Sequence, residues 1–247
     1  GLVALDENGQ VVPKLATDWV ASEDGLHYTF HLREGVKFHN GEEMTSEDVK
    51  YSLERCIANP GVNYNYLIIE SITCDDDYTV TIKTSAPFNA LLYRLSLDAA
   101  SIICKSADTS AEEFNKNPVG TGPFKFVSWE LGGDVVLEAF EDYWGGAPAV
   151  KRVIFRTIPE ALNRTIGLET GEVDLAYDLG ITDLESLAGN ESVTTLTSPS
   201  TTVWYVGMNV QKAPFDNEKV RQAVAYALDP QGYIDLVFSG EATPANY

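Results

Sequence analysis

The sequence is short of the residues that build metal sites and disulfide frameworks. It has three histidines and three cysteines, Cys56, Cys74 and Cys104, in 247 residues. The cysteines are widely spaced and form no CxxC, so a disulfide scaffold is excluded, although one isolated bridge stays open. We interpret them as small buried hydrophobic residues. The zinc-protease motif HExxH is also absent. We therefore predict no metal and no cofactor.

Positive charge and long apolar runs are scarce as well. The chain has 17 lysines and arginines against 37 acidic residues, a formal net charge of −20. A field of that sign repels phosphates and anionic lipid, so we predict no nucleic-acid partner. No apolar run reaches the roughly 18 residues of a membrane-spanning helix. The acidic surface is interpreted mainly as a solvated one that aids solubility.

The motifs of nucleotide binding and serine catalysis are missing too. GxSxG, GxGxxG and GxxxxGK[ST] do not occur, and Gly120-Thr121-Gly122 is followed by Pro123, which has no amide hydrogen for a phosphate. His27 and His31 share a strand face about 13 Å apart, too far to hold one ion. His39 has room to return over the sheet, but we interpret all three histidines as solvent-facing.

Adjacent carboxylates are frequent, as the composition makes inevitable. Examples are Glu42-Glu43, the 75–77 aspartate run and Glu141-Asp142. A hydrolase needs two carboxyl groups that converge in one pocket with separated pKa values. No such constellation is evident, so we predict no catalytic residue and keep a carboxylate-based hydrolase as the alternative from another class.

Strand and helix patterns alternate along the chain without a strict βαβ rhythm. Residues 26–33 alternate apolar and polar side chains, and Thr45 or Ser46 caps a helix with an apolar stripe of Val49, Leu53, Cys56 and Ile57. The fold class predicted is mixed α/β (α+β). Further strands are predicted at 2–5, 11–12, 68–74, 78–83, 101–104, 124–129, 135–140, 150–157, 173–177, 193–197 and 203–209. Further helices are predicted at 88–95, 161–170 and 182–188, after Asp216 or Asn217, and from Pro230.

Aromatic residues gather at predicted turns and strand ends, where rings offer amphipathic surface to a ligand. Packing and anchoring of loops are the ordinary roles of such rings. The stretch Tyr177-Asp178-Leu179-Gly180 stands out because it leaves a predicted strand end with a phenol, a carboxylate and flexible backbone together. We predict Tyr177, Asp178 and Leu179 as ligand-binding residues.

Several long motifs resemble one family. They are LATDWVASEDGLHYTFHLREGVKFHNGEEMTSEDVKYSLER (15–55), NPVGTGPFKFVSW (117–129), YWGGAPAVKRVIF (143–155), GEVD (171–174) and NVQKAPFDNEKVRQAVAYALD (209–229). In this order they resemble the family 5 extracellular solute-binding proteins, the oligopeptide-, dipeptide- and nickel-binding proteins that serve ABC importers. The resemblance covers nearly the whole chain.

The resemblance implies a partial lobe of a type II periplasmic-binding-protein-like fold. Residues 1–105 correspond to the small domain of the first lobe, and residues 106–247 to the central segment of the ligand-facing domain. Family members usually run to about twice this length. The chain is therefore expected to lack the family's N-terminal segment and its second lobe.

The resemblance also implies a function. A solute, here an oligopeptide or dipeptide, is bound reversibly between two lobes and delivered to ABC permease subunits outside the cytoplasm. A lipid anchor on the missing N-terminal segment is the one membrane contact expected. Trp204 and Tyr205, with Asn63 and Tyr64, join the predicted ligand residues. A nickel chelate or an oligosaccharide stays open as the ligand, as does a sensor or adhesion role.

Overall fold

The computed structural model describes residues 1–198 and 202–245. The chain forms two compact units, Gly1–Thr157 and Ile158–Tyr247. Strands and helices are mixed, which confirms the predicted fold class. The predicted boundary between residues 105 and 106 lies inside the first unit and stays a prediction. Among the described residues, no helix has the length and apolar content needed to cross a bilayer.

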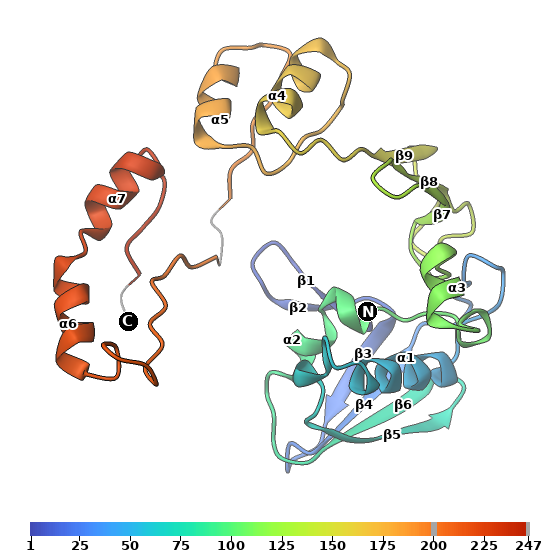
Figure 1. Cartoon of the computed structure of the whole chain (residues 1–247). Coiled ribbons are helices and arrows are strands. Elements are labelled where there is room, and N and C mark those ends of the chain that lie inside the picture. The colour runs from blue at the N-terminus through green and yellow to red at the C-terminus, as the bar shows by residue number, and fades with distance from the viewer. Residues whose placement is uncertain (199–201, 246–247) are drawn as a thin grey trace. The chain divides into compact units, whose positions relative to one another are not determined.

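The first unit is built around a four-stranded antiparallel sheet with the strand order β3-β4-β6-β5. In the pairing of β4 with β6, Phe30 lies opposite Val80 and Tyr28 opposite Ile82. A small hairpin precedes this sheet, as the sequence predicts (Figure 1). The strands are β1 (Val3–Leu5), β2 (Val11–Pro13), β3 (Ala16–Ala21), β4 (His27–Leu32), β5 (Ile69–Asp76) and β6 (Thr79–Thr84).

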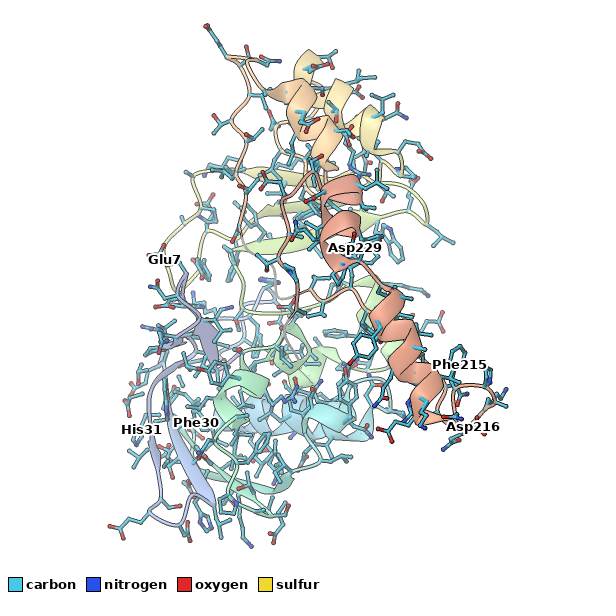
Figure 2. The ribbon with its side chains drawn as sticks, turned by 90° about the vertical axis from the view of Figure 1, so that its left-hand side faces the viewer. Glu7, Phe30, His31, Phe215, Asp216 and Asp229 are labelled. Carbon is cyan, nitrogen blue, oxygen red and sulfur yellow. The ribbon has the colours of Figure 1, made fainter. Side chains whose placement is uncertain are left out.

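The alternation of β4 sorts its side chains between core and solvent. Tyr28, Phe30 and Leu32 are buried, whereas His31 is exposed and its Nδ1 lies within hydrogen-bond distance of the Asp18 carboxylate. Figure 2 labels Phe30 and His31 on this strand. Successive side chains of a strand point to opposite faces, so the predicted pattern is confirmed.

Helix α1 (Ser46–Ala58) packs on the sheet and contacts β5 and β6 (Figure 1). Thr45 is its N-cap, and the predicted stripe is buried at Val49, Leu53 and Cys56. The core of this unit runs from Leu2 to Val119 and lies between the sheet, α1 and the segments that follow. Those segments are α2 (Leu91–Leu95), α3 (Ala111–Lys116) and the 3₁₀ turns Asn63–Asn65, Asp98–Ala100 and Lys105–Ala107.

A second sheet completes the first unit. It is three-stranded and antiparallel, formed by β7 (Phe124–Trp129), β8 (Val135–Ala139) and β9 (Arg152–Phe155). The hairpin between β7 and β8 turns at Gly132, whose φ of 78° lies in the left-handed region that favours glycine. All three strands were predicted, with small differences in their ends.

The second unit consists of four helices and their connections among the described residues. They are α4 (Ala161–Thr170), α5 (Ile181–Leu187), α6 (Glu218–Ala227) and α7 (Pro230–Val237). Helix α4 ends at Gly171, which has a left-handed φ of 72°, and Asn217 caps α6 through its side chain. These elements match the predicted helices closely.

Four predicted strands are wrong. Residues 173–177, 193–197 and 203–209 have no strand structure, and residues 101–104 form only one isolated bridge, between Ile103 and Gly120. The apolar, β-branched composition of these segments is typical of strands, but a strand forms only where a neighbour accepts its hydrogen bonds. Helix α2 is also shorter than the predicted 88–95, whereas α4 has the predicted bounds 161–170.

Candidate ligand-binding site

The predicted ligand residues 177–179 lie in the connection between α4 and α5, which we call the candidate loop (Tyr177–Gly180). The side chain of Tyr177 is 75% exposed, and Asp178 has a φ of 60°. This left-handed conformation is uncommon for a residue with a side chain, although aspartate adopts it more often than most. The loop ends where the Gly180 amide donates to the Asp183 carboxylate at 3.1 Å.

Arg164 on α4 contacts the candidate loop. Its Nη2 donates to the Asp178 carbonyl at 2.7 Å, and its Nη1 donates to the carbonyls of Ile158 at 2.7 Å and Pro159 at 2.9 Å. The sequence analysis missed Arg164. Its spacing on the helix gave no signal, because the acceptors are backbone groups that only the folded chain brings together.

The carboxylate of Asp178 is exposed, and it accepts no hydrogen bond within the part of the chain that the structure describes. Leu179 beside it is half-buried. The loop therefore offers a phenol, a free carboxylate and an apolar contact in three consecutive residues. Such a combination suits an amphipathic ligand with an ammonium group.

Trp204 and Tyr205 lie in an extended segment of the second unit, and both are strongly exposed. The ring of Trp204 packs 6.1 Å from that of Phe238, which lies 5.9 Å from Tyr233 in an edge-to-face contact. The structure thus adds Phe238 and Tyr233 to the predicted Trp204. Within 158–198 and 202–245, no hydrogen bond or ring contact joins this aromatic group to the candidate loop.

Asn63 and Tyr64 belong to the first unit, in the 3₁₀ turn after α1. Tyr64 is 72% exposed, and the Asn63 carbonyl accepts from the amides of Tyr66 and Leu67. Asn65, which follows Tyr64, is buried, and its side-chain oxygen accepts from Arg94 at 2.6 Å. The turn is thus anchored from below while Tyr64 faces solvent.

The first unit also contains an apolar pocket of about 830 Å³. Its lining includes Leu15, Phe114, Phe126, Trp129 and Trp144. None of the seven predicted ligand residues lines this pocket. The sequence analysis treated Trp144 as one of several turn aromatics and did not predict a cavity here.

The adjacent carboxylates Glu42 and Glu43 make structural contacts. Glu43 accepts from the Gly35 amide at 3.0 Å and from the Tyr78 hydroxyl at 2.5 Å, and Glu42 accepts from Ser106 at 2.8 Å. These bonds, that of Tyr78 first, lower the pKa of Glu43, while the same bond raises the pKa of Tyr78 to about 12. A general acid needs a raised pKa, so this pair does not support the hydrolase alternative.

His39 does not face solvent as predicted. Its ring is partly buried, packs edge-on against Phe140, and lies between the Gly120 amide at 3.3 Å and the Gly122 carbonyl at 3.0 Å. Burial lowers the pKa of His39 and outweighs the raising effect of the Gly122 bond, and the charge of Lys125 adds a smaller lowering effect. Residues 1–198 and 202–245 hold no group of three or more potential metal ligands.

Comparison with known proteins identifies the chain's family. The model of the bacterial extracellular solute-binding proteins, family 5, matches residues 10–247. The chain belongs to this family. Its members are bacterial extracellular proteins, and solute binding defines them.

The family's curated members include relatives that bind glutathione. The glutathione-binding protein of Pectobacterium atrosepticum is 38% identical over 251 residues, and that of Salmonella typhimurium is 35% identical. Both alignments cover 99% of this chain and 49% of the relative. This chain thus spans about half the length of these relatives.

Nearly the whole of this chain also superposes on about half of each of several solved structures. NikZ of Campylobacter jejuni in complex with Ni(L-His) has a TM-score of 0.88 at 30% identity and covers 100% of this chain and 51% of its own. AppA of Bacillus subtilis, in complex with a nonapeptide, has a TM-score of 0.86 at 29% identity, with coverage of 99% and 50%. DppA of Helicobacter pylori, a periplasmic binding protein with the peptide STSA, has a TM-score of 0.82 at 33% identity, with coverage of 99% and 53%.

Proposed function

We propose that the chain is part of a solute-binding protein that captures short peptides reversibly and delivers them to ABC permease subunits. The observation that carries the proposal is the similarity, over 99% of the chain, to relatives named for binding glutathione, itself a tripeptide. Glutathione is accordingly the first solute to test. The protein acts outside the cytoplasm, held by a lipid anchor on a segment that precedes this chain.

The candidate loop supplies the chemistry for a peptide. The exposed Asp178 carboxylate has no hydrogen-bond donor among its described neighbours, so it is available to the ammonium group of a peptide. Tyr177 presents an exposed ring for packing against the peptide. Leu179, Trp204, Tyr205, Asn63 and Tyr64 are proposed as further ligand contacts.

Asp178→Asn provides the test, because it keeps the shape of the side chain and removes its charge. The matched control is Asp174→Asn, four residues earlier, where the side chain is also exposed. We expect the variant to weaken glutathione binding about tenfold, as for the loss of one charge-assisted hydrogen bond, and the control to leave it unchanged. Isothermal titration calorimetry on protein purified without refolding measures both. Equal affinities of the two variants would remove Asp178 from the site.

A nickel complex is the second candidate, favoured by the similarity to NikZ bound to Ni(L-His). The same calorimetry with glutathione, the peptide Ser-Thr-Ser-Ala and Ni(L-His) separates the two. Heat of binding with Ni(L-His) alone would replace the peptide with a metal chelate. Binding of none of the three by a folded protein would overturn the proposed ligand class.

A further inference from the structure

We propose that Arg164 is the positioning residue of the candidate loop: it fixes the left-handed Asp178, and with it the side chains of Tyr177 and Leu179, before a ligand arrives. The proposal rests on the proposed function of that loop. Its basis is the geometry of one guanidinium group that bonds to two separate pieces of backbone.

The guanidinium joins the segment before α4 to the loop after it. Nη1 bonds to the carbonyls of Ile158 and Pro159, and Nη2 bonds to the carbonyl of Asp178. A planar fork with fixed donors can reach acceptors in two directions, whereas a lysine ammonium is a single point. Only arginine therefore suits both tasks at once.

The backbone of Asp178 needs such support. A φ of 60° is unfavourable for a residue with a Cβ, and it persists where the surroundings fix it. On one side, the Gly180 amide bonds to Asp183. On the other, Arg164 bonds to Asp178 itself. The loop is thus held at Asp178 and at Gly180 while the side chains of Tyr177 and Asp178 stay exposed.

The contacts of Arg164 are directed at backbone rather than at a counter-ion. Within residues 158–198 and 202–245 it forms no ion pair with a carboxylate, and its buried Nε has no hydrogen-bond partner. A buried donor without a partner is unfavourable. Arg164 keeps this position because its other nitrogens bond to three carbonyls, which ties its orientation to the path of the backbone.

The second unit contains a matched control for this arrangement. Arg221 on α6 donates from Nη1 to the carbonyls of Phe215 and Asp216, six and five residues before it. Ile158 and Pro159 have the same spacing from Arg164. Figure 2 labels Phe215 and Asp216 next to the start of α6. Arg221 therefore repeats the bonds to the segment before a helix, and within residues 1–198 and 202–245 it makes no side-chain bond to a loop beyond that helix.

The test compares Arg164→Lys with Arg221→Lys by hydrogen exchange in the full chain. Both variants lose similar bonds ahead of a helix, so a purely structural role predicts similar changes in each. We expect exchange of the Gly180 amide, which donates to Asp183 at the end of the loop, to accelerate about tenfold in Arg164→Lys and to stay at the wild-type rate in Arg221→Lys. Unchanged exchange in Arg164→Lys, or equal acceleration in both variants, would overturn the proposal.

A measurement on the unsubstituted protein decides the matter if Arg164→Lys does not fold. In ¹⁵N NMR spectra, a guanidinium fixed by bonds on both Nη atoms rotates slowly and gives separate Nη signals. We expect separate signals for Arg164, and a single averaged signal would overturn its fixed orientation. Titration with glutathione and with Ser-Thr-Ser-Ala then tests the loop's function separately. If neither peptide binds while Arg164 rotates slowly, the peptide proposal fails and the positioning role stays intact.

Discussion

At the scale of single residues, His39 ties the turn after β4 to the segment that leads into β7. The Gly120 amide donates to its Nδ1, so Nε2 carries the proton and donates to the Gly122 carbonyl. The His39 amide also donates to the Gly120 carbonyl at 2.9 Å. Protonation of Nδ1 would place a second N–H against the Gly120 amide. The native contacts therefore require the neutral ring.

This requirement predicts how stability responds to pH. The folded pKa of His39 is lowered from 6.5, so below that value the unfolded chain binds a proton that the folded chain resists. We expect the urea midpoint of unfolding to fall between about pH 7.5 and about pH 5.5, where histidine titrates. His39→Gln keeps a donor for Gly122 and does not titrate, so its midpoint should fall less over the same window. An identical fall in both proteins would assign the effect to other groups.

At the scale of elements, the start of α1 depends on one carboxylate. Asp48 accepts from the amide of Thr45 at 3.0 Å, from the Thr45 hydroxyl at 3.2 Å and, through its other oxygen, from the amide of Lys105 at 3.0 Å. It thus begins the helix and also fixes a distant segment to it. The side chain of Ser110, at the start of α3, accepts from the Glu113 amide at 3.2 Å.

These contacts predict unequal effects for two similar substitutions. Asp48→Asn replaces one acceptor oxygen by a donor, so an amide of Thr45 or Lys105 loses its partner, and we expect a loss of about 2–3 kcal/mol in the free energy of unfolding. Ser110→Ala removes a single cap bond and should cost about 0.5–1 kcal/mol. Urea denaturation measures both. A smaller loss for Asp48→Asn than for Ser110→Ala would show that this carboxylate does not organise α1.

Local patterns predicted those elements whose partners lie nearby in the chain. Helices α1 and α4 and the strand β7 follow from caps, glycine stops and alternation that are written in consecutive residues. The segments 173–177 and 203–209 carry an equally apolar pattern, but pairing depends on a neighbour that the pattern does not encode. The candidate site divides in the same way. The candidate loop was predicted from a strand end at 173–177 that the structure lacks, so its role as a site stays a prediction. Arg164 and Phe238 meet their partners only through the fold.

At the scale of the whole molecule, the two units differ in how much apolar surface they bury. The first unit has a continuous core between Leu2 and Val119. In the described part of the second unit, the buried apolar side chains are Leu187 and Ile234. No residue of α6 is buried, and Tyr226 on it is 91% exposed. Burial of apolar surface is the main favourable term in folding, so the first unit is the more stable one by itself.

This difference predicts a wide range of local stability. Amides of β4 and β6, paired across a buried sheet, should exchange with solvent only on global unfolding of the first unit, whereas those of α6 should open locally. We expect α6 amides, normalised to their intrinsic rates, to exchange at least about a hundredfold faster than those around Phe30, a difference of about 2.7 kcal/mol. Mass spectrometry of peptides from the exchanged protein measures both regions in one sample. Equal protection of α6 and β4 would mean that burial within each unit does not set its stability, and that other contacts protect the exposed helix.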